Sequence, residues 1–227
     1  MEPLVEIKNL SIRFPEGNST FEAVKGISFS IGKGEIVGVV GESGSGKSMS
    51  ALALMGLLPK DAEIASGSLC FQGEDLVTMK PEKRRQLCGS KMAMVFQEPM
   101  TSLNPVLKIE RQVGESLRIH TKLGNAEIHE RVVQALSEVG LPDPEGLCGK
   151  YPHELSGGMR QRVMIAQAMI NSPSLLIADE PTTALDCVVQ AQILELLRNI
   201  HRTKGTSILF ISHDLNVVRA LCSRVIV

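Results

Sequence analysis

The sequence lacks the aromatic residues, cysteine pairs and long apolar runs that mark several classes of protein. Its 227 residues include no Trp and a single Tyr, Tyr151, which disfavours an aromatic platform for single-stranded nucleic acid. The five cysteines are odd in number, widely spaced and without a Cys-x-x-Cys pair, so neither a disulfide framework nor a zinc finger is indicated. The longest nearly apolar stretch, residues 49–58, is far shorter than the roughly 20 residues that cross a bilayer.

The sequence also lacks an excess of charge of either sign. Lys and Arg total 24 against 25 Asp and Glu, and the net charge of -1 gives no overall attraction to nucleic acid. No nucleic-acid partner is therefore expected, and any site for a polyanion must be local. The N-terminus lacks the cationic start and apolar core of a secretory signal, which predicts a cytoplasmic location.

Apolar and polar residues alternate over residues 4–31, and this period of two predicts a pair of antiparallel strands. An apolar run at 35–40 then ends in a glycine-rich loop and leads into a helical pattern over 47–58. Further strands are expected at 68–72, 91–96, 175–178 and 207–211, and further helices at 158–170, 188–200 and 215–222. This order predicts an α/β fold with a mostly parallel core sheet, covered on both faces, and an N-terminal antiparallel β subdomain.

The middle of the chain has a different pattern. Residues 98–165 are rich in helical periodicity and loops, with periodic stretches at 109–119 and 126–139, and we expect a helical subdomain inserted in the core. Residues 224–227 have the pattern of a further strand at the end of the sequence. The sequence is therefore expected to be truncated, as a piece of a longer protein.

Residues 41–48, GESGSGKS, fit the phosphate-loop pattern G-x-x-x-x-G-K-[S/T] between a predicted strand and a predicted helix. Glycines allow successive backbone N–H groups to turn toward phosphate oxygens, and the helix N-terminus adds a favourable dipole. We expect a nucleotide at this loop, with a cation from Lys47 and a magnesium ligand from Ser48. The alternative is a glycine turn before a helix. The expected nucleotide-binding residues here are Gly41, Ser43, Gly44, Ser45, Gly46, Lys47 and Ser48.

Polar side chains follow three predicted buried strands, where parallel sheets form their ligand crevice. Asp179 is expected to hold magnesium and Glu180 to polarise the attacking water, although such a pair alone is more often a helix cap. Gln97 can offer its amide oxygen to magnesium or water, and His213 can donate a hydrogen bond to a terminal phosphate. Alone, each of these two residues is typical of an ordinary surface or capping role. The expected catalytic residues are Glu180, His213, Lys47 and Gln97, and the expected metal ligands are Ser48, Gln97 and Asp179.

A second anion-binding helix terminus is predicted within residues 155–162, LSGGMRQR. One nucleotide cannot readily use both this terminus and the phosphate loop of the same chain, so a second molecule is expected to share the site. The alternative is a helix start with glycine flexibility.

Taken together, these motifs resemble the ATP-binding subunit of ABC transporters, in family order and over nearly the whole chain. The phosphate loop, the Q-loop Gln97, the signature at residues 155–161, the Walker B pair, the D-loop at 184–186 and the switch His213 all match. The resemblance implies one nucleotide-binding domain over residues 1–227 with the P-loop NTPase fold of ABC ATPases, in which residues 98–165 form the helical signature subdomain.

The resemblance also implies that two such domains pack head to tail. Each ATP then lies between the phosphate loop of one chain and the signature of the other, with the D-loop beside it. An aromatic residue near the N-terminus stacks on adenine; Phe14 stands where the family usually has tyrosine, and Val24 is its apolar neighbour. The nucleotide contacts implied in this way are Phe14, Val24, Ser156, Gly157, Gly158 and Asp186.

A finer resemblance comes from FQEPMTSLNP at 96–105, EPTTALD at 180–186 and VQAQIL at 189–194. These strings are similar to the ATPases of oligopeptide, dipeptide and nickel importers. They imply an ATP-hydrolysing motor that uses ATP and Mg²⁺ at the cytoplasmic face of a bacterial or archaeal cell membrane. The implied partners are a second ABC ATPase subunit, two transmembrane permease subunits and an extracytoplasmic substrate-binding protein.

Three other classes of protein share part of this pattern. A soluble ABC ATPase of DNA repair or translation would have the same motifs, but a long coiled-coil insert and basic arms are missing. A P-loop kinase or GTPase would have no role for the signature at residues 155–161, and the Asn-Lys-x-Asp motif by which GTPases recognise the base is missing. A nucleotide-regulated assembly protein would bind ATP without transport.

Overall fold

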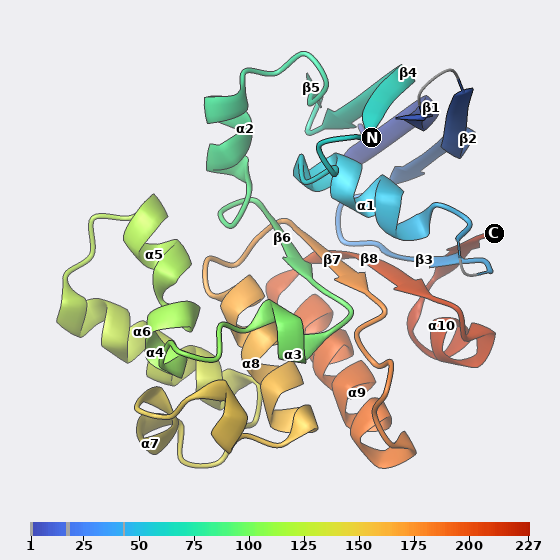
Figure 1. Cartoon of the computed structure of the whole chain (residues 1–227). Coiled ribbons are helices and arrows are strands. Elements are labelled where there is room, and N and C mark those ends of the chain that lie inside the picture. Colours follow the sequence, from blue (N-terminus) through green and yellow to red (C-terminus); the bar gives the residue numbers. More distant parts are fainter. Residues whose placement is uncertain (1, 17–18, 43) are drawn as a thin grey trace.

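The computed structural model of the chain describes residues 2–16, 19–42 and 44–227 and contains two β-sheets flanked by helices (Figure 1). The antiparallel sheet has the strand order β2-β1-β4-β5, and the parallel sheet has the order β6-β7-β8-β3-β9. The prediction of an α/β fold with a mostly parallel core sheet and an N-terminal antiparallel subdomain is confirmed.

The antiparallel sheet begins with the strand pair expected over residues 4–31. Strand β1 (Val5–Glu16) pairs with β2 (Ser19–Ile31), and its other edge pairs with β4 (Glu63–Phe71). The edge strand expected at 68–72 is thus the second half of a longer strand, and the two-residue β5 (Glu74–Asp75) lies beyond it. The first half of β4 has only one large apolar residue, Ile64, among the exposed residues Glu63, Ala65 and Ser66, and so lacks the apolar alternation that predicts a strand.

The parallel sheet separates two hydrophobic cores. Side chains of successive strand residues alternate between its faces: Ile177 and Leu209 join the core under the antiparallel sheet, whereas Leu176 and Phe210 join the core on the other side. All residues of the two central strands are buried, which explains their continuous apolar sequence. The strands of this sheet are β3 (Ile36–Val40), β6 (Met92–Val95), β7 (Leu175–Asp179), β8 (Ser207–Ser212) and β9 (Arg224–Ile226).

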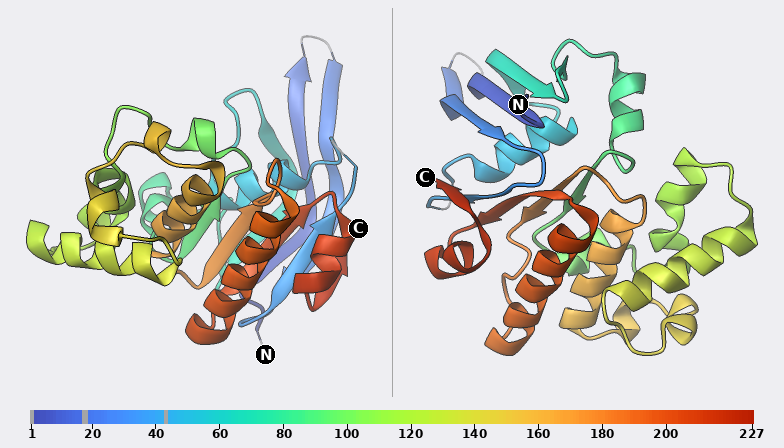
Figure 2. Two further views of the ribbon diagram at one scale, coloured as in Figure 1. Left: turned by 90° about the horizontal axis from the view of Figure 1, so that it is seen from below. Right: turned by 180° about the vertical axis from the view of Figure 1, so that it is seen from behind.

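Helices cover the two faces of the parallel sheet in different ways. Helix α1 (Lys47–Met55) packs between the two sheets, whereas α8 (Gly157–Met169), α9 (Cys187–Lys204) and α10 (Leu215–Leu221) lie on the opposite face (Figures 1 and 2). Helix α1 therefore has sheet on both sides, which explains why its buried residues occupy more than one narrow stripe.

The inserted region forms a helical group at one side of the molecule (Figure 2). Gly114 separates α4 from α5, so the single helical stretch expected at 109–119 is in fact two short helices. The helix expected at 126–139 is α6. Helix α8 continues beyond residue 165 and packs on β6. The helices of this region are α3 (Pro99–Ser102), α4 (Ile109–Val113), α5 (Glu115–His120), α6 (Asn125–Glu138), α7 (Pro144–Cys148) and the 3-10 helix η1 (Pro152–Glu154).

Two further differences from the expected pattern have local causes. Helix α1 ends at Met55 rather than near residue 58, because Gly56 adopts a left-handed conformation with φ 70° and stops the helix. Helix α2 (Pro81–Leu87) was not predicted, because it has no buried residue and hence no apolar periodicity. Within residues 2–16, 19–42 and 44–227, none of the helices is both long and apolar enough to cross a bilayer.

Candidate nucleotide site

The glycine-rich segment 41–46 connects the end of β3 to the start of α1, as the phosphate-loop pattern predicts. Gly46 precedes the helix with φ 87°, and a Cβ atom there would lie 2.5 Å from the carbonyl oxygen of Ala23 and 2.8 Å from Val24 Cγ2. Only glycine fits this position, so the loop is shaped by its contact with β2 as well as by its own sequence. Ser43, predicted as a nucleotide contact, lies outside the described residues.

The Lys47 ammonium folds back over this loop. Its Nζ donates hydrogen bonds to the carbonyl oxygens of Gly41 at 2.7 Å and Glu42 at 2.8 Å, and it lies 3.4 Å from Ser45 Oγ. A positive charge is thereby held against the loop at the N-terminus of α1. Loop, charge and helix dipole all favour an anion at this point.

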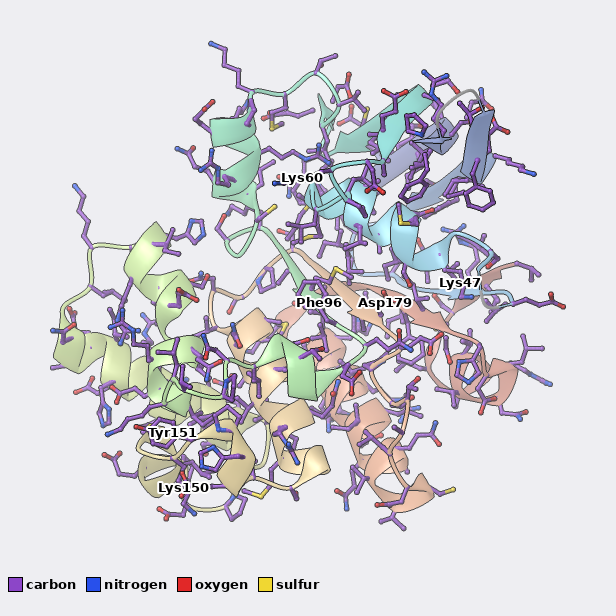
Figure 3. All side chains as sticks on the ribbon, in the orientation of Figure 1. Lys47, Lys60, Phe96, Lys150, Tyr151 and Asp179 are labelled. Carbon is purple, nitrogen blue, oxygen red and sulfur yellow. The ribbon has the colours of Figure 1, made fainter. Side chains whose placement is uncertain are left out.

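Ser48 and Asp179 form a pair of oxygen ligands between α1 and β7. Ser48 Oγ donates a hydrogen bond of 3.1 Å to Asp179 Oδ1, and Asp179 is only 5% exposed. Burial raises the pKa of the Asp179 carboxyl above its ordinary value, against the opposing effects of the Ser48 hydrogen bond and the Lys47 charge. Figure 3 shows Lys47 and Asp179 near each other at the carboxyl end of the sheet.

This donor set fits Mg²⁺. The ion prefers hard oxygen ligands and commonly takes one or two from the protein, the remainder being phosphate and water. A cation beside Asp179 would also offset the cost of burying its charge. Gln97, the third predicted ligand, forms its described hydrogen bond elsewhere, and its role at the metal stays a prediction.

Three hydrogen bonds converge on the carboxylate of Glu180, which follows β7 directly. Gln97 Nε2 donates at 3.2 Å, Thr183 Oγ1 donates at 2.9 Å, and His213 Nδ1 lies at 3.1 Å, all of them to Oε2. Glu180 itself has φ 45°, and its backbone N–H bonds to Ile211 O at 2.9 Å on the neighbouring strand. The structure therefore brings together three of the predicted catalytic residues from the ends of three strands.

Thr183 is a further residue at this site, and the motif at residues 180–186 does not by itself give it a role. The available signal was the three-residue spacing from Glu180 directly after a buried strand, where a hydroxyl can reach back across a turn. That spacing is common in turns, so it becomes informative only with the side-chain geometry.

A pocket of about 450 Å³ lies beside the phosphate loop, between the two sheets. Val24, predicted to contact the nucleotide base, lines it together with Phe29, Gly41 and Lys47. Phe14 is not among the described lining residues: it faces Phe21 across the β1–β2 pair, with ring centroids 6.4 Å apart. Stacking of Phe14 on adenine stays a prediction, and Phe29 is an aromatic side chain at the pocket that the sequence reasoning did not select.

The signature residues lie away from this loop. Ser156 caps α8 by accepting a hydrogen bond of 3.3 Å from the Met159 N–H, and α8 lies on the face of the parallel sheet opposite α1 (Figure 2). Gly157 has open space around it, whereas a Cβ on Gly158 would lie 2.8 Å from Val189 Cγ1 on α9. The structure thus does not bring the residues of the signature to the phosphate loop of the same chain.

Asp186 occupies the N-cap of α9. Its Oδ1 accepts hydrogen bonds from the N–H groups of Val188 at 3.0 Å and Val189 at 2.9 Å. This arrangement gives the side chain a structural role in starting the helix. Its contact with a nucleotide stays a prediction.

Comparison with known proteins points to one family. Residues 24–183 match the sequence profile described as ABC transporter. The chain is 51% identical over 227 residues to a peptidoglycan transport ATP-binding protein of Agrobacterium fabrum, covering 100% of this chain and 42% of that protein. It is 47% identical over 224 residues to a dipeptide transport ATP-binding protein of Haemophilus influenzae, covering 99% of this chain and 68% of that protein.

Solved structures agree with these relatives. A dimeric ATP-binding cassette in a post-hydrolysis state, bound to ADP and Pi, superposes with a TM-score of 0.87 at 28% identity and covers 98% of this chain and 93% of that one. The chain thus spans nearly the whole of that cassette, but less than half of the Agrobacterium relative and about two thirds of the Haemophilus one.

Proposed function

Because the chain belongs to the ABC transporter family and is an ATPase of that family, we propose that it is the motor subunit of an importer. The proposed cargo is a dipeptide or oligopeptide, with nickel as the other candidate. Relatives named for dipeptide and oligopeptide transport support a peptide as the transported cargo. They also favour a transport role over a soluble ATPase of DNA repair or translation.

The observation that carries the proposal is the distribution of the site over two faces of the sheet. Lys47 and Ser48 lie at the phosphate loop, and Ser48 bonds to Asp179, the residue before Glu180. Helix α8, which Ser156 caps, lies on the opposite face of the parallel sheet (Figure 2). In the proposed mechanism, two chains pair head to tail, and each ATP lies between the phosphate loop of one and the signature of the other. Hydrolysis removes the γ-phosphate bridge and the pair opens.

Within each site the residues would divide the work by their chemistry. The Lys47 ammonium and the N-terminus of α1 would bind the phosphates, and Ser48 with Asp179 would hold Mg²⁺, whose charge neutralises the phosphate oxygens. Glu180 would orient the attacking water and accept its proton. His213, with 61% of its side chain exposed, is free to turn from Glu180 toward the terminal phosphate.

The proposed partners follow from transport. A second ATPase subunit would complete each site, two transmembrane permease subunits would receive the motion, and an extracytoplasmic binding protein would deliver the cargo. Residues 99–105 begin with α3 and follow closely after Gln97, and we propose them as the lever against a permease at the cytoplasmic face of the membrane.

The test is Glu180→Gln, which keeps the size of the side chain and removes its charge. We expect the variant to bind ATP, to accumulate a closed dimer on gel filtration with Mg·ATP, and to release phosphate at least about 100-fold more slowly, as for loss of a general base. Glu195→Gln is the matched control, because this exposed glutamate on α9 pairs with Arg198 away from the site. Wild-type phosphate release by Glu180→Gln, or failure to dimerise with ATP, would refute the mechanism.

A further inference from the structure

The carboxylate of Glu180 is held by side chains that differ in exposure and in their distance along the chain. Gln97 and His213 lie on separate loops, 83 and 33 residues away along the chain, and both are exposed. Thr183 lies three residues away and is half-buried. All three contact Oε2, so they act on the same atom and leave the orientation of the other oxygen dependent on how firmly Oε2 is held.

Thr183 and Glu180 belong to one closed turn. The Thr183 N–H donates to Glu180 O at 3.1 Å while its Oγ1 donates to Glu180 Oε2 at 2.9 Å, so the main chain and the side chain of one residue both bond to the same glutamate. A β-branched side chain has few rotamers, so the hydroxyl is presented at a nearly fixed position. This link does not depend on how the loops around it are placed.

The other two donors have competing ligands. In the proposed function the amide oxygen of Gln97 serves magnesium or water and His213 serves the terminal phosphate, so ATP binding gives both exposed side chains a second ligand that can change their orientation toward Glu180. The Thr183 hydroxyl has no such assignment. Of the three contacts, it is the one whose side chain has no second ligand in the proposed cycle and lies within the same turn as Glu180.

We propose that Thr183 is a positioning residue for hydrolysis, which fixes the Glu180 carboxylate so that its second oxygen faces the attacking water. The inference rests on the proposed role of Glu180. Hydrogen bonds to charged groups are among the stronger ones in proteins, and a misplacement of a catalytic group by about 1 Å can cost about 100-fold in rate. The Thr183 hydroxyl therefore acts on the turnover rate rather than on ATP binding.

The experiment compares Thr183→Val with Thr183→Ser in the full chain, by steady-state phosphate release over a range of Mg·ATP concentrations. Thr183→Val keeps the shape and removes the donor, and we expect kcat to fall about tenfold with KM for ATP within about twofold of wild type. Thr183→Ser keeps the donor and should retain at least about half of the wild-type kcat.

Thr182→Val is the matched control, because Thr182 is the preceding residue and is buried, but its hydroxyl accepts a hydrogen bond of 3.4 Å from Gln190 Nε2. It should retain the wild-type kcat. The proposal is overturned by a wild-type kcat in Thr183→Val, by Thr183→Ser as slow as Thr183→Val, or by an equal loss in Thr182→Val.

A second comparison separates this inference from the proposed function. In a Glu180→Gln background, adding Thr183→Val should cause no further loss, because the charged acceptor is already gone. A further tenfold loss would show that Thr183 acts independently of Glu180 and would overturn the inference alone. Rapid hydrolysis by Glu180→Gln itself would instead overturn the proposed function.

Discussion

Replacing Gly158 by alanine tests how closely the start of α8 packs on α9. Both Gly157 and Gly158 are in the first turn of α8, and neither has a left-handed backbone. A methyl group on Gly157 meets nothing within 4 Å, whereas one on Gly158 would lie 2.8 Å from Val189 Cγ1. The two substitutions are thus chemically identical and differ in their surroundings.

The expected magnitudes follow from these surroundings. Alanine in a helix is favoured over glycine by up to about 1 kcal/mol, so Gly157→Ala should leave the free energy of unfolding unchanged or raise it slightly. At Gly158 the same gain is opposed by overpacking, which costs about 1–3 kcal/mol, because the β-branched Val189 has little rotamer freedom. We expect Gly158→Ala to lower the free energy of unfolding by about 1–2 kcal/mol.

Urea denaturation of the two single variants measures the difference. Adding Val189→Ala removes the obstructing methyl groups, so Gly158→Ala should then cost at least about 0.5 kcal/mol less than it does in the wild-type chain. Equal stability of Gly157→Ala and Gly158→Ala would refute the packing argument. So would an undiminished loss in the Val189→Ala background.

Two further predictions concern pH. Because burial raises the pKa of Asp179, the charge of this carboxyl lowers stability at pH values above its ordinary pKa of 3.8. Asp179→Asn should therefore unfold at a higher urea concentration than wild type at neutral pH, and the difference between their urea midpoints should narrow as pH falls. The same substitution should abolish Mg²⁺-dependent ATP hydrolysis. His129 bridges Glu110 at 3.0 Å and Glu145 at 2.9 Å, and these bonds raise its pKa above 6.5. The stability that these bonds add is fully present below pH 6.5 and is lost as pH rises through the raised pKa of His129. The urea midpoints of His129→Gln and wild type should therefore differ at about pH 5.5 and converge at about pH 9. A difference between the midpoints that stays constant with pH would contradict this.

The strands and the phosphate loop were predictable because their signals are local. Buried parallel strands are continuous apolar runs, and the glycines of residues 41–48 stand in a strand-to-helix context that few other structures share. The same holds for Asp179 and Glu180, which come directly after such a run. Their convergence with Gln97 and His213 follows from parallel strands ending at one edge.

Other features depend on tertiary contacts that a linear pattern does not contain. Helix α2 has no apolar stripe and is anchored instead by Arg84, whose guanidinium donates to the carbonyl oxygens of Ala53 and Leu54 near the end of α1. Phe14 lies in a strand as its sequence pattern predicts, but the contact of its ring with that of Phe21 could not be read from the pattern. Whether a side chain on a hairpin points to a ligand depends on sheet packing, not on sequence spacing.

The separation of α1 and α8 by the parallel sheet determines how many nucleotide sites are lost when wild-type and defective chains pair with each other. In the proposed twofold pair, each chain would contribute its phosphate loop to one nucleotide chamber and its signature helix to the other, so the two chambers would close together. A chain with a defective signature would therefore disable only the chamber that contains its partner's phosphate loop. If the partner also had a defective phosphate loop, both defects would lie in that same chamber, and the other chamber would remain intact.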